Sequence, residues 1–411
     1  MPWRKNRRVK EMKKILIVIN TLGHAGAETA LLELLRHMDP KQYQVDLFVL
    51  LGQGEMVHRL PEHVKLLNRR YDDSSVLSRE GKEHLKKHVI RTLLTRGTVI
   101  RMTPYLCRQM MGMFRRRRLQ MDKLLWRAMA AGAQRFSESY DLAVAYLEGG
   151  AAYYVTDYVK AVKKAAFIHV DYVQAGYNRS LDRDCYVKMD RIFAVSDEVK
   201  ESFLAVYPEC DERTEVFHNL INQEQIREQA KQPGGFTDDF DGYRILTVGR
   251  LTSQKDFQVS VEAMKLLKDS GVKARWYILG EGEKRAELDA KIRELGLGQD
   301  FFLPGAVENP YPYMAQADLY VHATRFEGKS IAIQEAQTLG CAIIASNCSG
   351  NREQIVPEID GLLCEMTPDG ICKSVRELLD DAEKRRHFGQ AAANKKLSDS
   401  REVEKLLRLM W

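Results

Sequence analysis

Short runs of apolar residues recur along this chain, and each is followed by a glycine or polar turn and then by a helical pattern. The first run is ILIVI (15–19), followed by the turn TLGHAG (21–26), by apolar residues three and four apart over 27–38, and by the run VDLFVL (45–50). Strand, turn, helix and strand form a βαβ unit, and such units build parallel sheets that helices cover on both faces. The pattern therefore predicts an α/β fold.

The strand and helix patterns form two series, and 411 residues exceed what a single hydrophobic core usually holds. A polar, turn-rich stretch at 223–242 separates the two series and is the best candidate for a linker. We expect two doubly wound, Rossmann-like domains that face each other across a cleft at the carboxyl ends of their strands. The expected divisions are an N-terminal domain (1–222), the linker (223–242), a C-terminal domain (243–395) and a C-terminal helix (396–411) that packs back on either domain.

The expected elements follow from the same periodicities. In the first half, further strands are predicted at 142–146, 165–169, 191–195 and 215–219. In the second half, strands are predicted at 244–248, 275–279, 300–304, 318–322 and 342–346, with helices around 257–268, 283–295 and 331–339.

Composition excludes several classes of protein. Apolar residues make up 45% and charged residues 29%, which is a folded composition, and no apolar run approaches the ~18 residues that span a bilayer. ILIVI precedes Asn20 and a glycine turn, so we interpret it as a core strand and not as part of a signal peptide, and Met12 fits the start as well as Met1. The seven cysteines include no CxxC pair, which favours core positions in a reducing cytosol over disulfides or a zinc site.

The net charge of +6 is unevenly distributed. Residues 1–14 carry +6 and residues 82–127 carry +11, so the rest of the chain carries −11. In the second basic segment, cations alternate with the apolar residues Met110, Met111, Met113, Phe114 and Trp126. A basic amphipathic helix of this kind binds anionic membrane surfaces, so we expect residues 82–127, together with 1–14, to contact such a surface. A helical insertion with a solvated basic face is the alternative. Nucleic-acid binding is not expected, because the chain has no recognition motif for it.

Two cations follow the first predicted strand of the C-terminal domain. They are Arg250 and Lys255 in VGRLTSQKD (248–256), placed just before a helix begins. A guanidinium can bind two oxygens of a diphosphate while a lysine adds a mobile charge and the helix dipole adds to both. The pair thus predicts a diphosphate site, and two solvated surface cations are the alternative.

A second candidate group surrounds two glutamates that lie before and within a predicted helix. Glu327 follows the strand at 318–322, and Glu335 lies in the first turns of the helix. Between them, the backbone amides of Gly328, Lys329, Ser330 and Ile331 would face the cleft, ready for an anion, with Ser330 capping the helix. A carboxylate at the position of Glu335 could bind a ribose diol. The alternative is an ordinary pair of surface glutamates.

Weaker signals lie in the N-terminal half. In TLGHAGAE, Gly23 and Gly26 are three residues apart, so the dinucleotide fingerprint fails, yet the turn still lets a phosphate or sugar approach the backbone. Glu148 precedes two glycines after a predicted strand, where it either faces an acceptor hydroxyl or begins a helix.

Two DxD pairs are candidates for a metal-bound diphosphate. Asp239–Asp241 lies in the expected linker, and Asp182–Asp184 lies on a predicted helix, where we expect it to be solvated. Neither position supports a metal site, and we expect none.

The order of these motifs resembles that of the retaining GT-B glycosyltransferases of family 4. The resemblance covers nearly the whole C-terminal half, is looser in the N-terminal half, and is absent from about 52 to 140. The C-terminal stretches that carry it are VGRLTSQKD (248–256), LGEGEKRAELDAKIRELG (279–296), ADLYVHATRFEG (317–328), EGKSIAIQEA (327–336), SGNREQI (349–355) and DGLL (360–363). The N-terminal stretches are ILIVINTLGHAGAE (15–28), FIHVDY (167–172), VSDEVKESF (195–203) and FHNLIN (217–222).

The resemblance implies roles for these residues. Arg250 and Lys255 would bind the diphosphate of a nucleotide sugar, and Glu335 would bind its ribose. Glu327 would lie beside the transferred sugar and the phosphate, and His169 would lie near the sugar from the N-terminal side. The turn at Gly23 and Gly26 would approach the diphosphate across the cleft. Two departures are the sequence GKS after Glu327, where many members have glycine, an apolar residue and proline, and the single glycines of the turn.

The expected function is transfer of a sugar, with retention and without a metal or other cofactor, from a nucleotide sugar to a glycan or lipid-linked acceptor. Uridine is the commoner base in the family, so a UDP-sugar is favoured. The setting would be synthesis of surface polysaccharide or glycolipid, in the cytoplasm or on the inner face of the membrane. A nucleotide-sugar epimerase or hydrolase, or a protein that binds nucleotide sugars without turnover, is the alternative.

Overall fold

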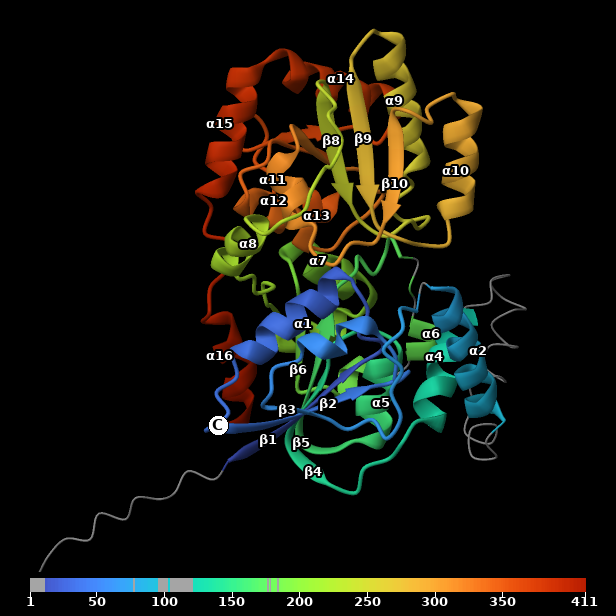
Figure 1. The fold of residues 1–411 in the computed structure, drawn as a ribbon. Coiled ribbons are helices and arrows are strands. Elements are labelled where there is room, and N and C mark those ends of the chain that lie inside the picture. Colours follow the sequence, from blue (N-terminus) through green and yellow to red (C-terminus); the bar gives the residue numbers. More distant parts are fainter. Residues whose placement is uncertain are drawn as a thin grey trace, which may run out of the picture.

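The computed structural model describes residues 12–76, 78–94, 103, 121–175, 177, 179–182 and 185–411. These residues form two parallel sheets, one from each half of the chain, and the sheets lie one above the other in Figure 1. The N-terminal sheet has seven strands in the order β3-β2-β1-β4-β5-β6-β7, and the C-terminal sheet has six in the order β10-β9-β8-β11-β12-β13. In each sheet the chain starts at the centre, runs to one edge and returns to the other side, which is doubly wound topology. The predicted GT-B fold of two Rossmann-like domains is confirmed.

The N-terminal sheet is buried on both faces. Along its central strand β1, Leu16 and Val18 belong to one apolar core, whereas Ile15, Ile17 and Ile19 belong to the core on the opposite face. This two-sided burial explains why the strand is a continuous apolar run. The strands are β1 (Lys13–Ile19), β2 (Tyr43–Val49), β3 (Val64–Leu66), β4 (Ser139–Ala145), β5 (Lys160–Ile168), β6 (Arg191–Ala194) and β7 (Thr214–Val216). The α-helices are α1 (Gly26–Arg36), α2 (Arg79–Leu93), α4 (Met121–Gly132), α5 (Gly150–Tyr158), α6 (Arg179–Asp182) and α7 (Asp197–Val206).

The C-terminal sheet repeats this arrangement. Its strands are β8 (Tyr243–Val248), β9 (Ala274–Leu279), β10 (Phe301–Gly305), β11 (Leu319–His322), β12 (Ile343–Ser346) and β13 (Leu362–Cys364). The helices of this half are α8 (Gln223–Ala230), α9 (Gln258–Asp269), α10 (Arg285–Glu294), α11 (Tyr311–Gln316), α12 (Ile331–Thr338), α13 (Ser349–Arg352), α14 (Pro368–Asp380) and α15 (Ala382–Ala393). Short 3-10 helices complete the described elements: η1 (Glu55–Arg59), η2 (Tyr186–Lys188), η3 (Pro208–Arg213) and η4 (Arg408–Met410).

The stretch expected as a linker, 223–242, differs from the turn-rich segment that its composition suggests. Its first eight residues form α8, which packs against α11 and α12 of the C-terminal domain. The Asn222 side chain caps this helix by accepting a hydrogen bond from the Gln225 backbone N–H at 3.0 Å, and Ile226 is buried. The cap, the buried side chain and side-chain hydrogen bonds from Gln223 and Arg227 to neighbouring carbonyls together order this polar helix.

The C-terminal segment packs back on the N-terminal domain. In α16 (Glu402–Leu407), Val403 and Leu406 are buried in the same apolar core as Ile15 and Ile17 of β1, and Figure 1 shows α16 beside the N-terminal sheet. The chain thus passes between the domains twice, from β7 to α8 and from α15 to α16.

The two basic segments are described only in part. Residues 1–11, 95–102 and 104–120 lie outside the described residues, and with them Met110, Met111, Met113 and Phe114. Trp126 of α4, expected on the apolar membrane face, packs instead against Gly149 and Gly150 at the start of α5. No helix among the described residues is both long and apolar enough to cross a bilayer.

Asp182 is fully buried, which corrects the expectation that it is solvated. The Lys123 ammonium pairs with its carboxylate at 2.6 Å, and the hydroxyls of Tyr172 and Tyr207 donate to it at 2.5 and 3.1 Å. These partners come from distant parts of the chain, so the local sequence DRDCYV carries no sign of them. Asp184 lies outside the described residues.

Candidate functional site

A cleft of about 870 Å³ lies between the two domains, at the carboxyl ends of their central strands. Its N-terminal wall contains the turn after β1 and the residues after β5, and its C-terminal wall contains the segments after β8 and β11 and the start of α12. The strand order reverses between β1 and β4 in one sheet and between β8 and β11 in the other, and open α/β sheets bind their ligands at such reversals.

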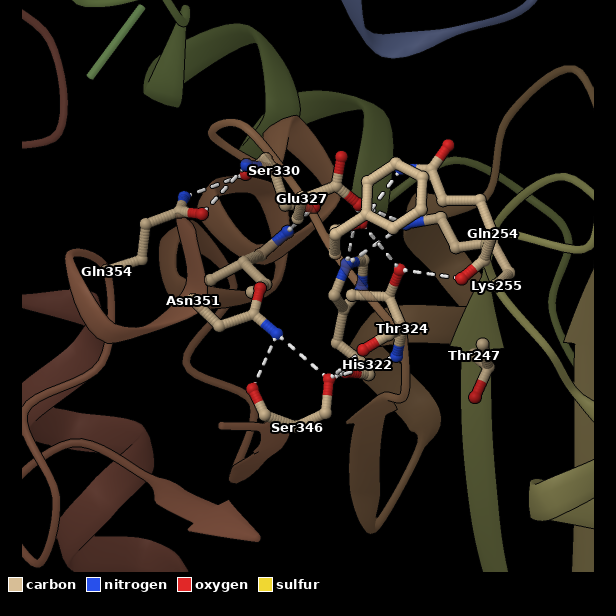
Figure 2. Close-up of polar contacts among 12 residues, drawn as sticks. Thr247, Gln254, Lys255, His322, Thr324, Glu327, Ser330, Ser346, Asn351 and Gln354 are labelled. Carbon is tan, nitrogen blue, oxygen red and sulfur yellow. Dashed lines mark hydrogen bonds and ion pairs between the residues drawn. The ribbon is translucent and has the colours of Figure 1, made fainter. Parts of the chain in front are cut away.

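The centre of the C-terminal wall is a cluster of Lys255, Glu327 and His322 (Figure 2). The Lys255 ammonium forms an ion pair with the Glu327 carboxylate and lies 3.2 Å from His322 Nε2. Burial would raise the pKa of Glu327, but the charge of Lys255 and the hydrogen bond from His322 outweigh it, so the pKa lies well below its usual range. Burial and Lys255 together lower the pKa of His322 to about 4. At neutral pH the cluster is therefore a carboxylate, an ammonium and a neutral imidazole.

The loop that carries Glu327 is braced by hydrogen bonds from neighbouring strand ends (Figure 2). The Ser346 hydroxyl, at the end of β12, donates to the Thr324 carbonyl at 2.6 Å and accepts from the Thr324 N–H at 3.0 Å. The Gln254 side-chain amide donates to the Phe326 carbonyl at 2.9 Å. Support of this kind holds a reactive carboxylate in one position.

The donor loop, residues 328–331, follows Glu327 and touches the N-terminal domain. A Cβ on Gly328 would come within 2.0 Å of the His169 carbonyl oxygen, so only glycine permits this close approach. The predicted cap is present, because the Ser330 hydroxyl accepts from the Ile333 N–H at 3.4 Å. The Ser330 N–H, however, donates to the Gln354 side chain at 2.8 Å. It is thus occupied and not free for an anion, unlike the amides of Gly328, Lys329 and Ile331, for which no hydrogen bond to the described residues is found.

Glu335 lies on α12 and lines the cleft, although its side chain is largely buried. The Tyr311 hydroxyl donates to its carboxylate at 2.8 Å. Burial raises the pKa of Glu335 to about 7, and the Tyr311 hydrogen bond and the positive charge of Arg59 oppose this rise. This carboxylate is placed where it can accept hydrogen bonds from a ligand in the cleft.

Arg250 is exposed in the cleft, opposite the start of α1. Burial raises the pKa of Glu28, in the first turn of α1, to about 7, and the charge of Arg250 opposes this rise across the cleft. Gly26 begins α1 and lines the cleft next to Ile331 of the donor loop. Gly23 is placed differently, over the carboxylate of Glu55.

His169 lines the cleft from the end of β5. Its Nε2 is buried and has no hydrogen-bond partner among the described residues. Burial lowers the pKa of His169 to about 4, so the ring is neutral at physiological pH. A neutral imidazole with an unused nitrogen is suited to a ligand hydroxyl.

Glu148 is not among the residues that line the cleft. Its carboxylate accepts hydrogen bonds from the backbone N–H groups of His169 and of Val170, the latter at 3.1 Å. Burial raises its pKa to about 7. The geometry therefore makes Glu148 a support for the end of β5 and gives no contact with an acceptor.

The structure brings together most of the residues predicted from the sequence. Arg250, Lys255, Glu327 and Glu335 line one wall of the cleft, and His169 lines the other. His322 was missed, although the signal was available: it is the last residue of a buried strand at the edge where Arg250 and Glu327 were expected. Tyr311 was missed because nothing in the sequence pairs it with Glu335, 24 residues later.

Comparisons with known proteins agree with this fold. Residues 228–395 match the family model described as Glycosyl transferases group 1. The N-acetylgalactosamine-N,N'-diacetylbacillosaminyl-diphospho-undecaprenol 4-alpha-N-acetylgalactosaminyltransferase of Campylobacter jejuni is 30% identical over 217 residues, which are 52% of this chain and 58% of that protein. The UDP-Gal:alpha-D-GlcNAc-diphosphoundecaprenol alpha-1,3-galactosyltransferase of Escherichia coli is 31% identical over 139 residues, 33% of this chain and 36% of that protein. The matches thus span only about a third to just over half of the length of these relatives.

Solved structures resemble the whole chain. HepE of Anabaena in complex with UDP-glucose superposes with a TM-score of 0.65 at 15% identity, covering 96% of this chain and 98% of that one. TarM superposes with a TM-score of 0.67 at 12% identity, covering 97% of this chain and 99% of that one. At such low identities these structures establish the GT-B fold of the chain, whereas the C-terminal half carries the sequence match to group 1 glycosyl transferases.

Proposed function

We propose that this protein is a glycosyltransferase that moves a sugar from a UDP-sugar to a hydroxyl of a glycan or lipid-linked acceptor. The observation that carries the proposal is the ion-paired Lys255 and Glu327 beside Arg250, in a cleft between two Rossmann-like domains. Transfer from a nucleotide sugar requires stabilisation of a departing diphosphate, and positioned cations in a water-poor cleft stabilise such charge strongly.

In this proposal, Arg250 and Lys255 bind the diphosphate, the start of α1 at Gly26 approaches it from the other wall, and Glu335 binds the ribose. The amides of Gly328, Lys329 and Ile331 contact the phosphate nearest the sugar, and His169 hydrogen-bonds to a hydroxyl of the sugar. Arg250 and Lys255 supply the positive charge that a metal supplies in other glycosyltransferases, so no metal is required.

The chemistry we propose is departure and attack on the same face of the sugar, which retains its configuration. The bond between the anomeric carbon and the diphosphate oxygen breaks while the bond to the acceptor oxygen forms. The acceptor proton passes to the departing phosphate oxygen. Glu327, which Lys255 keeps ionised, stabilises positive charge that develops on the sugar. Detection by intact mass of a sugar covalently attached to Glu327 would replace this mechanism with a double displacement.

The names of relatives support the proposed donor, a UDP-sugar, and the proposed lipid-linked acceptor. The relatives from C. jejuni and E. coli are named for acceptors linked to diphosphoundecaprenol, and solved structures of HepE contain UDP and UDP-glucose. We therefore propose a role in the synthesis of surface polysaccharide or glycolipid, on the cytoplasmic face of a membrane.

The test is a thermal-shift panel of UDP, GDP and ADP and their sugars, followed by incubation of the best sugar donor with and without lipid-linked acceptors. Ligand at about 100 times its Kd stabilises the folded state by about 2.7 kcal/mol. The proposal requires stabilisation by a nucleotide sugar and product only when acceptor is present. Turnover without any acceptor would indicate an epimerase or a hydrolase, and binding without turnover a non-catalytic protein.

We also propose that the basic segment binds anionic membranes through α2 and the residues that follow it. On α2, the side chain of Lys86 is 69% exposed, and Ile90 is 57% exposed on the same helix. Co-flotation with phosphatidylglycerol vesicles at 50 mM salt that is lost at 500 mM is the expected result, and no binding at either salt contradicts it.

A further inference from the structure

Lys329 is a further cation in the cleft besides Arg59, Arg250 and Lys255, and it lies on the donor loop between Glu327 and α12. Unlike Lys255, which pairs with Glu327, Lys329 forms no ion pair with a carboxylate of the described residues. Its ammonium lies 2.9 Å from His218 Nδ1, across the domain boundary. Three carboxylates raise the pKa of Lys329 electrostatically, but all three lie beyond ion-pair distance: Asp197, Glu353 and Glu402.

His218 is a weak partner for an ammonium. Burial, together with the charge of Lys329, lowers the pKa of His218, so its ring is neutral and Nδ1 can accept one hydrogen bond. An ammonium has three N–H donors, so this contact leaves two of them for other groups. Burial also lowers the pKa of Lys329, which reflects the cost of holding this charge away from water without a counter-ion.

The position of Lys329 is as informative as its charge. Its neighbour Gly328 lies against the His169 carbonyl, and Ser330 is held by Gln354, so both flanking residues have restricted backbones. A lysine side chain has a flexible four-carbon stem, so the ammonium of Lys329 can leave the imidazole for a stronger partner in the cleft. An anionic oxygen is the partner that an unpaired ammonium favours most.

We propose that Lys329 binds an anionic oxygen of the donor, in addition to the oxygens that Arg250 and Lys255 bind. This inference rests on the proposed function. Two parts of a nucleotide sugar can supply that oxygen: the phosphate that carries the sugar, or a carboxylate on the sugar itself. In the second case the protein selects acidic sugars such as uronic acids.

The experiment compares wild type with Lys329→Gln, which removes the charge and keeps a hydrogen-bond donor for His218. Lys329→Arg, which keeps the charge, is the conservative variant, and Lys231→Gln is the control because the side chain of Lys231 is 70% exposed. Dissociation constants for UDP, UDP-glucose and UDP-glucuronate are measured by isothermal titration calorimetry at low salt, with thermal unfolding to verify that each variant is folded.

The inference predicts that K329Q weakens binding at least tenfold, whereas K329R and K231Q stay within threefold of wild type. If K329Q weakens the binding of all three ligands equally, the partner of Lys329 is the phosphate. If K329Q weakens the binding of UDP-glucuronate alone, the partner of Lys329 is the carboxylate on the sugar. K329Q affinities within twofold of wild type for all three ligands overturn the inference and leave the proposed function intact. Failure of wild type to bind any of the three overturns both.

Discussion

Gly328 is the point where the donor loop touches the N-terminal domain, so Gly328→Ala tests whether this contact positions the site. The added Cβ would lie 2.0 Å from the His169 carbonyl oxygen and 3.4 Å from a methyl group of Val199. Favourable contacts between heavy atoms lie near 3.5 Å, so the loop and the end of β5 must separate by about 1.5 Å. Glu327 directly precedes this loop, so its carboxylate moves when the loop moves.

A misplacement of about 1 Å can reduce catalysis about 100-fold, and overpacking typically costs about 1–3 kcal/mol of stability. We therefore expect G328A to lose about 100-fold in kcat/KM in a coupled assay of UDP release. The control is Gly298→Ala, since a Cβ at Gly298 meets nothing within 4 Å. Equal activities for G328A and G298A would refute the reasoning.

Three further predictions concern buried carboxyl groups. Because the pKa of Glu335 is about 7, UDP affinity should rise from pH 6 to 8 as the group ionises, and Glu335→Gln should bind more weakly with no such rise; calorimetry at several pH values measures both. The pKa of Glu148 is about 7 when folded against 4.5 in the reference state, so the folded state holds an extra proton between these values and loses stability as pH rises through them. The Tm of Glu148→Gln relative to wild type should accordingly increase from pH 5 to 7. Asp182→Asn removes the carboxylate that pairs with the buried Lys123, and urea denaturation should show a loss of about 3–5 kcal/mol.

The fold was predictable because strands buried on both faces are continuous apolar runs, which are visible without any tertiary information. Strands β1 and β9 are clear examples, with burial over nearly all of their length, and the middle of β8 is also buried. The edge strands β3 and β13 have only three residues each, so their sequences show no recognisable hydrophobic pattern, and the sequence analysis predicted neither. The helix α8 was taken for part of a linker because its sequence QEQIREQA is polar apart from Ile226.

The site residues that could be predicted are those that follow the carboxyl ends of strands. Arg250, Lys255, Glu327 and Glu335 all follow strand ends, so the topology itself brings them to one cleft. Contacts between distant segments were not predictable. The burial of Asp182 by Lys123, and the use of Glu148 to hold the backbone at His169, depend on side chains that meet only after folding.

The central claim is that Arg250 and Lys255 bind the diphosphate of the donor. The direct measurement is the UDP affinity of the double variant Arg250→Ala/Lys255→Ala, by isothermal titration calorimetry, with thermal unfolding to verify that it is folded. Loss of two charge-assisted contacts, each contributing about 1.5–3 kcal/mol, should weaken binding at least 100-fold. A folded double variant that binds UDP as tightly as wild type would contradict the account.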